Sequence, residues 1–294
     1  MSTTRNLEKE VADYYRENTP LIHKTFGYTY QGFPQPKLLQ YANLHSSSPL
    51  KVADLGSGFG GPSRYILRQY PSVRSITSVN KCLEQLKLHQ ASLRDEEKAR
   101  CALVYADYHH TTLQDNEFDR VLFLESLEHS YDLPQAMKEA YRILRPGGQL
   151  FIKGWFSEYP REKWNAVTFA IERANACDFH DLHQLVDTIH DTKFTGVKIL
   201  PSCSKGYAQR GDWLHTFNDP KVELLSTTFP VWDHMPWLRH AITLSGDGVL
   251  SKTAYGRLAL RGLDLNWLMQ LVMNGPTKKS GFTYNHYVLV ATKS

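Results

Sequence analysis

Short apolar runs alternate with amphipathic stretches through the first half of the chain. Five such runs predict buried strands, over residues 51–55, 75–79, 102–106, 120–124 and 149–153. Apolar residues recur at helical spacing between most of them, over residues 62–69, 82–93 and 133–144. Strands that alternate with helices in this way form a parallel sheet with right-handed crossovers. The pattern therefore predicts an α/β fold.

Both ends of the chain follow other patterns. Residues 7–24 repeat apolar side chains at roughly helical spacing, and residues 43–49 read as a linker into the first strand. Residues 145–148, Arg-Pro-Gly-Gly, predict a turn before the fifth strand. The second half is less regular, and its predicted elements are helices over 161–193 and 254–273 and strands over 222–229 and 284–292.

These patterns suggest a main domain with additions at two places. We expect residues 1–48 to form an N-terminal helical lid and residues 49–294 to form the main domain. Within the main domain, cap insertions are expected at about 155–220 and 230–280. They would lie over the carboxyl ends of the strands, where open α/β sheets bind their ligands.

Composition narrows the class of protein. The 294 residues are 41% hydrophobic and carry a net charge of only +4, with no run of five Lys or Arg, which argues against nucleic acid as a partner. Neither an 18-residue apolar run nor an N-terminal apolar signal segment is present, so we expect no membrane span and no secretion signal. The four cysteines are widely spaced and show no metal-binding pattern. These features predict a cytoplasmic protein with reduced thiols and no metal site.

The most informative segment follows the first predicted strand, where Asp54 precedes the string GSGFGG at residues 56–61. Glycines at such a turn let the backbone approach a ligand closely, and the helix that follows adds its N-terminus. The acid suits an amino group or hydroxyl, so a cofactor with an amino acid moiety and a nucleoside would fit. A P-loop is excluded because no Gly-Lys-Ser/Thr follows, and the spacing fits G-x-G-x-G better than the dinucleotide pattern of NAD(P)-dependent oxidoreductases. An ordinary tight turn is the plainer alternative.

Two further segments extend this pattern. Asn80 ends the second strand and Gln85 follows five residues later, and residues 117–150 read EFDRVLFLESLEHSYDLPQAMKEAYRILRPGGQL. With these segments, residues 50–154 resemble the class I S-adenosylmethionine-dependent methyltransferases, and within them the small-molecule branch of sterol-type and natural-product enzymes. The resemblance implies an enzyme with a Rossmann-like fold, a mostly parallel seven-stranded sheet, an N-terminal helical lid and a helical cap. It also implies S-adenosylmethionine as cofactor and S-adenosylhomocysteine as product.

The resemblance assigns cofactor contacts residue by residue, to Asp54, Gly56, Ser57, Gly58, Gly60, Asn80, Gln85, Asp107, Tyr108 and Glu125. In that assignment Asn80 binds the ribose hydroxyls, Asp107 accepts a hydrogen bond from the adenine amine, and Tyr108 packs beside the adenine ring. The plainer alternatives are a helix cap for Asn80 and an Asx-turn for Asp107.

Candidate catalytic residues follow the fourth strand. Glu125 and His129 are four residues apart, so one helical turn would place them on the same face, and histidine titrates near neutrality and can act as a general base. A helix cap or a water-binding role is the alternative for His129. We expect Tyr28, Tyr30 and Trp155 beside the acceptor, where aromatic faces stabilise a cation. Core packing is the alternative for these rings.

The sequence thus predicts methyl transfer to a small apolar acceptor. The first hypothesis is carbon methylation of an isoprenoid, such as a prenyl diphosphate, or of a similar alkene, and Mg²⁺ would accompany the acceptor only if it is a diphosphate. O-methylation of a hydroxylated natural product such as a polyketide is the second hypothesis. A non-methylating cyclase or binding module on the same fold is the third. The sequence does not identify the acceptor. It also leaves the oligomeric state open, and a homo-oligomer is one alternative.

Overall fold

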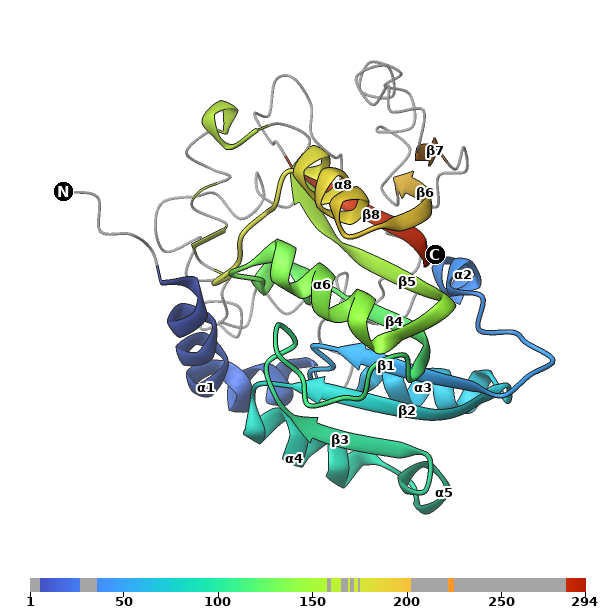
Figure 1. Ribbon diagram of the computed structural model, residues 1–294. Helices are drawn as coiled ribbons and strands as arrows, with labels where there is room; N and C mark the ends of the chain where they lie inside the picture. The colour runs from blue at the N-terminus through green and yellow to red at the C-terminus, as the bar shows by residue number, and fades with distance from the viewer. Residues whose placement is uncertain are drawn as a thin grey trace.

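The computed structural model describes residues 6–26, 36–157, 160–164, 169, 172–173, 175–201, 222–224 and 284–294. Within these residues the core of the protein is one sheet of eight strands in the order β3-β2-β1-β4-β5-β8-β6-β7 (Figure 1). The strands are β1 (Leu50–Leu55), β2 (Val73–Asn80), β3 (Cys101–Tyr105), β4 (Phe118–Leu124), β5 (Leu144–Ser157), β6 (Phe194–Pro201), β7 (Val222–Leu224) and β8 (Tyr284–Lys293).

The sheet is mostly parallel. Strands β1 to β5 pair in parallel, and β8 runs antiparallel between β5 and β6. The strand order reverses beside β1, where the crossover from β3 returns to β4. The predicted Rossmann-like fold with a mostly parallel sheet of seven main strands is confirmed, and the three-residue β7 adds a short eighth strand next to β6.

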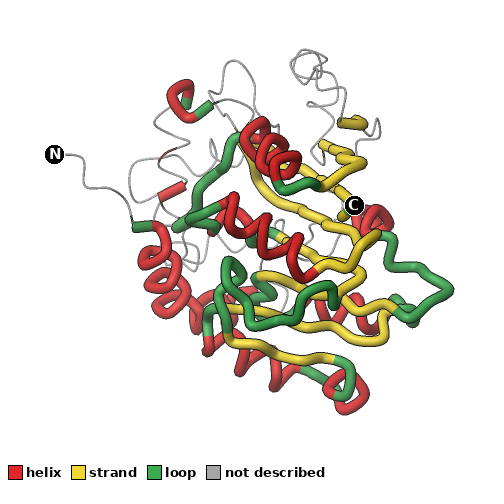
Figure 2. The backbone as a smooth tube through the Cα atoms, viewed as in Figure 1, coloured by secondary structure: helices red, strands yellow, loops and turns green. Residues whose placement is uncertain are grey.

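Helices cover both faces of this sheet, as Figure 2 shows in red against the yellow strands. On one face Ala53 and Leu55 pack in a core shared with α6 (Leu133–Ile143) and α8 (Leu182–Asp191). On the opposite face Val52 packs in a core shared with α2 (Pro36–Leu39) and α3 (Gly61–Gln69). This three-layer arrangement explains why the central strands read as continuous apolar runs rather than alternating ones.

Helices α4 (Leu83–Ser92) and α5 (Asp95–Lys98) connect β2 to β3. Three short turns complete the described helical elements: η2 (Gln40–Ala42), η3 (Leu127–His129) and η4 (Arg161–Lys163). None of the described helices has the length and apolar character needed to cross a bilayer.

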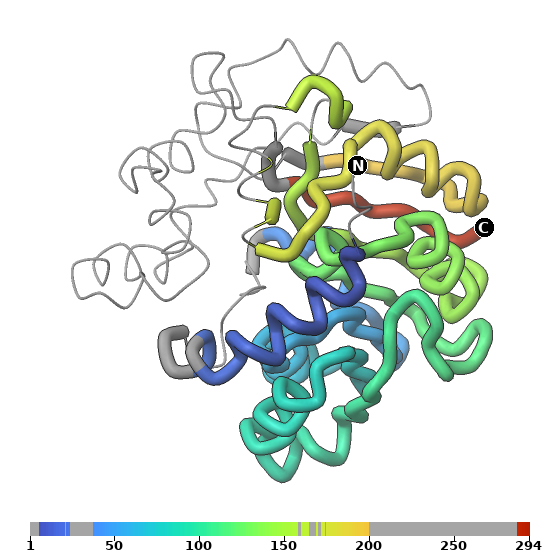
Figure 3. The backbone as a smooth tube through the Cα atoms, turned by 90° about the vertical axis from the view of Figure 1, so that its left-hand side faces the viewer, coloured from blue at the N-terminus to red at the C-terminus, as the bar shows by residue number. Residues whose placement is uncertain are grey.

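Helix α1 (Leu7–Phe26) confirms the predicted N-terminal helix and crosses one end of the sheet (Figure 3). Its Tyr14 and Ile22 pack against Phe59 of the glycine-rich loop and against Ala176. This contact places the N-terminal helix at the carboxyl ends of β1 and β4. Its action as a lid stays a prediction.

Local sequence signals account for where several helices begin. The side chain of Asp132 accepts a hydrogen bond from the backbone N–H of Gln135 at 3.0 Å and caps α6. The side chain of Asp181 caps α8 in the same way, through the N–H of His183 at 2.7 Å. Helix α3 instead begins after Gly60, which takes a left-handed conformation with φ +73°.

The predicted turn at residues 145–148 requires a correction, because these residues lie inside the continuous strand β5. Leu144 pairs with Phe118 and Gln149 pairs with Arg120, so the four residues stand opposite a single residue of β4. They therefore form a bulge, in which Gly147 has φ +76°. The Pro and Gly residues that predicted a turn therefore bend the chain inside strand β5, rather than before the strand begins.

The expected cap at 155–220 does not hold for residues 182–201. Helix α8 packs into the main core, and β6 pairs with β8 within the sheet. The stretch 161–193, predicted to be largely helical, contains η4 and α8, and its described residues 169 and 172–173 are also helical. The terminal strand at 284–292 is confirmed as β8, and residues 222–224 of the predicted strand 222–229 form β7. The helix predicted at 254–273 and the cap at 230–280 lie outside the described residues.

Candidate functional site

A cavity of about 360 Å³ opens at the carboxyl ends of β1 to β4, beneath α1. Its walls come from the glycine-rich loop, the segments after β2, β3 and β4, and one face of α1. Eight of the residues singled out in the sequence line it: Gly56, Gly58, Asn80, Gln85, Asp107, Tyr108, Glu125 and His129. The topology thus brings the predicted cofactor and catalytic residues of four separate segments together, as expected at a switch in strand order.

Two glycines of the loop are required for different reasons. Gly58 has φ +55°, and a Cβ added there would meet no atom within 4 Å, so this position faces open space in the cavity wall. Gly56 has φ +83°, and its added Cβ would lie 2.4 Å from Cβ of Ser126. Gly58 therefore leaves room for a ligand, whereas Gly56 leaves room for the chain that follows β4.

Three predicted cofactor residues in or just before the glycine-rich loop do not line the cavity. Asp54 is only 1% exposed and accepts a 2.5 Å hydrogen bond from Ser63, and burial raises the pKa of its carboxyl to about 6. Gly60 leaves room for the imidazole of His89, which an added Cβ would meet at 2.0 Å. The buried hydroxyl of Ser57 has no hydrogen-bond partner in the described part of the chain. A cofactor contact at these three positions stays a prediction.

Asn80 and Gln85 form a pair on the cavity wall. The amide nitrogen of Asn80 donates to Oε1 of Gln85 at 2.8 Å and approaches the carbonyl of Gly58 at 3.4 Å. With its nitrogen engaged in this way, Asn80 presents its carbonyl oxygen as the acceptor for a ligand hydroxyl. The pairing explains the five-residue spacing noted in the sequence.

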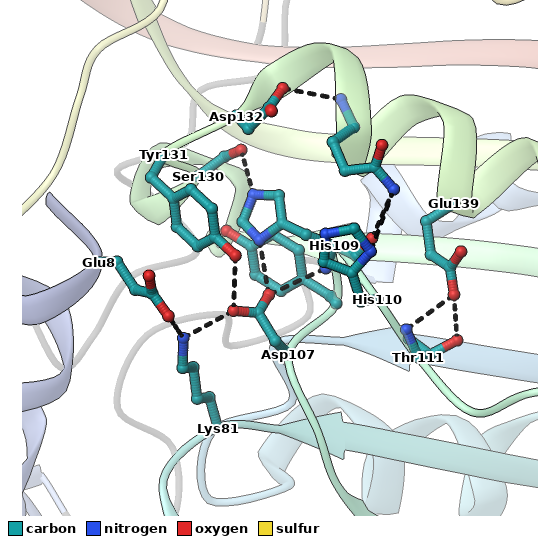
Figure 4. Close-up of polar contacts among 12 residues, drawn as sticks. Glu8, Lys81, Asp107, His109, His110, Thr111, Ser130, Tyr131, Asp132 and Glu139 are labelled. Atoms are coloured by element: carbon teal, nitrogen blue, oxygen red, sulfur yellow. Dashed lines mark hydrogen bonds and ion pairs between the residues drawn. The ribbon is translucent and has the colours of Figure 1, made fainter.

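Asp107 is the centre of a polar network at the rim of the cavity (Figure 4). One carboxylate oxygen accepts from the backbone N–H of His109 at 2.9 Å and from its Nδ1 at 2.5 Å. The other accepts from Lys81 at 2.7 Å and from the hydroxyl of Tyr131 at 3.0 Å. Burial alone would raise the pKa of Asp107, but the hydrogen bonds from His109 and Lys81 outweigh it and hold this pKa well below its usual range.

The network constrains the predicted adenine contact. A carboxylate offers about four lone-pair sites, and these four donors occupy them. An adenine amine can therefore bind Asp107 only by replacing a donor. Lys81 and Tyr131 are the exposed donors, and the ammonium of Lys81 also pairs with Glu8 of α1 (Figure 4). The adenine end and the N-terminal helix thus share one lysine.

His129 is held by both ring nitrogens. Its Nδ1 lies 2.9 Å from the carbonyl oxygen of Ala176, which can only accept, so Nδ1 carries the proton. In the neutral ring Nε2 is then an acceptor, and it lies 2.8 Å from the hydroxyl of Tyr15 on α1. Nε2 is therefore the basic atom of this ring. Tyr15 also lines the cavity, but it was not among the predicted site residues. The signal for it was its helical spacing: Tyr15 follows Val11 by four residues on α1, and both side chains face the cavity.

Glu125 is held by the neighbouring strand. Its backbone takes φ +54°, and its N–H donates to the carbonyl of Lys153 at 2.6 Å. Its carboxylate pairs with the ammonium of Lys153 at 2.5 Å, and the two side chains are 10% and 1% exposed. A lysine within the apolar run at 149–153 was the one sequence signal for this partner.

The predicted aromatic acceptor residues are placed only in part. Tyr28 and Tyr30 lie outside the described residues. Trp155 is half-buried, and its backbone N–H donates to Oε1 of Glu128 at 2.7 Å. It is not among the residues that line the cavity, which in the described part of the chain has tyrosines 15, 105, 108 and 131 and Phe59 as its aromatic lining. An acceptor contact by Trp155 stays a prediction.

Among the described residues, no group of three or more His, Cys, Asp or Glu side chains has an arrangement that could hold a metal ion.

Comparison with known proteins agrees with this geometry. A family model described as "Methyltransferase domain" matches residues 53–152, which run from the end of β1 into β5. The methyltransferase GfsG of Streptomyces halstedii is 31% identical over 230 residues, which cover 66% of this chain and 81% of that protein. The sterol 24-C-methyltransferase erg-4 of Neurospora crassa is 29% identical over 127 residues, 43% of this chain and 33% of that protein. The chain thus spans about a third of the length of this sterol enzyme.

A solved structure shares the fold along the whole chain. The geranyl diphosphate C-methyltransferase of Streptomyces coelicolor, in complex with Mg²⁺, geranyl-S-thiolodiphosphate and S-adenosyl-L-homocysteine, superimposes with a TM-score of 0.64. The match covers 100% of both chains at 12% sequence identity. At this identity the similarity extends to the fold.

Proposed function

The chain belongs to the class I S-adenosylmethionine-dependent methyltransferases of the small-molecule branch, and on that premise we propose that it methylates carbon in a small isoprenoid or similar alkene. Bound S-adenosylmethionine supplies an activated, cationic methyl donor. The protein's own residues then have to bind it, align the acceptor and accept a proton.

Several residues of the cavity fit the cofactor. Gly58 leaves the loop side open, Asn80 offers an acceptor for ribose, and Asp107 lies where the adenine end is expected. The charged residues that line the cavity are, besides histidines, four acids and two bases: Glu8, Glu84, Asp107, Glu125, Arg16 and Lys81. An excess of carboxylates suits a cationic donor.

One observation carries the proposal: the cavity presents two proton acceptors from the same turn. Nε2 of His129 and the carboxylate of Glu125 both belong to the segment after β4 and both line the cavity. Methyl addition to an alkene leaves a carbocation, which becomes neutral when a base removes a neighbouring proton. An anionic carboxylate beside the cavity also stabilises such a cation.

The relatives support an isoprenoid acceptor. The relatives in sequence include a sterol 24-C-methyltransferase, and those in fold include a geranyl diphosphate C-methyltransferase. The described lining does not favour a diphosphate, because its two basic residues are already paired, Arg16 with Asp13 and Lys81 with Glu8 and Asp107. We therefore favour an uncharged isoprenoid.

O-methylation is the second candidate, and the contact between Tyr15 and His129 favours it. A hydroxyl already donates to Nε2 of His129 at 2.8 Å. The hydroxyl of an acceptor that replaced Tyr15 would be in position to give its proton to the same atom before methyl transfer.

Incubation with ¹³C-methyl-labelled S-adenosylmethionine tests both candidates. The acceptors would be three sets: uncharged isoprenoid alkenes, their diphosphates and hydroxylated polyketides. Label found on carbon of an uncharged isoprenoid supports the proposal, and the carbon shift of the methyl group distinguishes C-methyl from O-methyl products. Label found only on oxygen replaces the proposal by the second candidate. Cofactor binding without label in any set would favour the non-methylating alternative.

A further inference from the structure

A buried lysine lies beneath the cavity and is not part of the chemistry described above. Lys153 is on β5 and only 1% of its side chain is exposed. Its ammonium pairs with Glu125 at 2.5 Å, and its carbonyl accepts the N–H of the same residue at 2.6 Å. Both ends of Glu125, which itself has a left-handed backbone, are thus fixed by one residue of the neighbouring strand.

Burial of such a pair requires a reason other than stability. Transfer of two charges from water into a protein costs as much free energy as their attraction returns, and apolar replacements are often neutral or stabilising. Every neighbour of Lys153 in β5 from Leu150 to Ile152 is apolar and fully buried. A lysine in this run therefore indicates a role for its charge at the cavity rather than in the core.

A second acid feels the charge of Lys153 but makes no direct ion pair in the described part of the chain. Glu128 is 4% exposed, accepts from the N–H of Trp155 and has a second carboxyl oxygen with no partner in the described part of the chain. Burial, followed by the charge of Glu125, raises the pKa of Glu128 to about 8. The two acids therefore differ: Glu128 keeps its proton near neutral pH, and Glu125 faces a cation.

We propose that Lys153 is a positioning residue of the methyl-transfer site, whose ammonium holds the Glu125 carboxylate ionised and oriented toward the cavity. This inference rests on the proposed function, because it gives Glu125 the state required of a proton acceptor or cation stabiliser. Lys153 does not line the cavity and acts only through Glu125.

The other charged and titratable groups around Glu125 come from every wall of the site. Glu128 and His129 follow it in the turn η3, and the cavity is also lined by Glu8, Tyr15, Arg16, Lys81, Cys82, Glu84, Tyr105, Asp107, Tyr108, His109 and Tyr131. Arg16 and Lys81 are paired with other acids. Among the described residues, Lys153 is thus the cation in direct contact with the Glu125 carboxylate.

The test is a carboxyl titration that needs no acceptor. The full chain is produced with glutamate labelled with ¹³C at the side-chain carboxyl carbon, and the Glu125 and Glu128 signals are assigned by their absence in Glu125→Gln and Glu128→Gln. Lys153→Met should raise the titration midpoint of Glu125 by about one to three pH units relative to the native chain, since an adjacent cation favours the carboxylate. Lys153→Arg, which keeps the charge, should leave the midpoint near its native value.

Lys293 offers a matched control. It is a buried lysine of β8, 8% exposed, whose ammonium donates to Asn116, Tyr141 and Leu144. Lys293→Met removes a buried lysine of comparable size but should leave the Glu125 midpoint unchanged. An equal shift in both lysine variants, or no shift in Lys153→Met, overturns the proposal.

Two further readings keep the test decisive. If Lys153→Met does not fold, Lys153→Gln takes its place. The order in which Glu125 and Glu128 titrate in the native protein is a second test of the proposal. In the native protein the Glu125 carboxyl must lose its proton at a lower pH than the Glu128 carboxyl; a Glu125 that titrates with or after Glu128 overturns the proposal. Failure of the proposed function would instead appear as absent S-adenosylmethionine binding in calorimetry, which the carboxyl titration does not use.

Discussion

The hydroxyl of Tyr15 lies 2.8 Å from Nε2 of His129, although the two residues are 114 positions apart in the chain. Their rings also meet edge to face, with centroids 5.3 Å apart. Because Nδ1 of the same imidazole faces the carbonyl of Ala176, the tyrosine meets the basic nitrogen. One contact therefore joins the N-terminal helix to the predicted general base.

Loss of the proton acceptors should slow turnover more than it weakens cofactor binding. If the acceptor must lose a proton, His129→Asn or Glu125→Gln should lower kcat by roughly 10²–10⁴-fold for the residue that acts as base. Steady-state assays on the acceptor identified by the labelling experiment measure kcat, and calorimetry with S-adenosylhomocysteine is the control for binding. Near-native kcat in both variants would mean that neither Glu125 nor His129 is the base.

Removal of the Tyr15 hydroxyl tests the link between helix and base. Tyr15→Phe keeps the ring packing and removes one hydrogen bond, so we expect kcat to fall by about 10-fold with the affinity for S-adenosylhomocysteine within a few-fold of native. Tyr14→Phe is the matched control, since Tyr14 packs on Phe59 and does not line the cavity.

Deletion of residues 1–33 should stop turnover and leave cofactor binding measurable. Normal turnover of that truncated chain would contradict a lid function.

Gly58→Val should weaken S-adenosylmethionine binding by about 100-fold or more, which is about 2.8 kcal/mol. The reason is that its side chain would enter the open space beside the loop. Gly147→Val is the control for backbone strain, because Gly147 also has positive φ and open space around an added Cβ but lies in the β5 bulge. Calorimetry should show the loss at position 58 alone, and equal losses would attribute the effect to strain.

The polar network of Figure 4 predicts opposite effects for two of its members. Asp107→Asn removes an acceptor for the adenine amine and should weaken S-adenosylhomocysteine binding by about 1–3 kcal/mol. Lys81→Met removes the donor that competes for the same oxygen and should leave the affinity unchanged or increase it. If both variants bind equally weakly, Asp107 acts by holding Lys81 rather than by contacting the cofactor.

Glu128 should make the protein less stable as the pH rises. Burial raises the pKa of Glu128 from 4.5 in the unfolded chain to about 8, so between these values the folded state holds one proton more than the unfolded state. The free energy of unfolding should therefore fall by up to about 1.4 kcal/mol per pH unit across this range. Asp54, with a pKa of about 6, adds to the decline only in the lower part of the range.

Urea unfolding from pH 6 to pH 8 isolates the contribution of Glu128. The native chain should lose stability over this interval, and Glu128→Gln, which has no proton to lose, should show a flatter profile. Parallel profiles would mean that Glu128 is already ionised in the folded protein.

Much of the fold could be predicted because strand and helix periods are local. The runs that became β1, β4 and the second half of β5 were recognisable because strands covered on both faces are mostly apolar. The bulge at 145–148 was read as a turn, since a sequence shows turn chemistry but not whether the ladder continues on either side. Helix α8 and β6 were assigned to a cap because the strand that joins β6 to the sheet, the antiparallel β8, begins 83 residues after β6 ends. A partner so distant in the sequence leaves no local signal.

By itself the sequence determined the glycine-rich loop, the acids and amides at the strand ends, and hence the edge at which the site forms. Carboxyl ends of parallel strands meet at one edge whatever the details of packing, so eight predicted residues reach the same cavity. Only the tertiary structure decided which groups those residues contact. Tyr15 reaches His129, and Lys153 reaches Glu125, through pairings of distant segments that no local pattern encodes. The protonation states of Glu128 and Asp54 were likewise decided by burial, which depends on the completed core and not on the residues next to them in the chain.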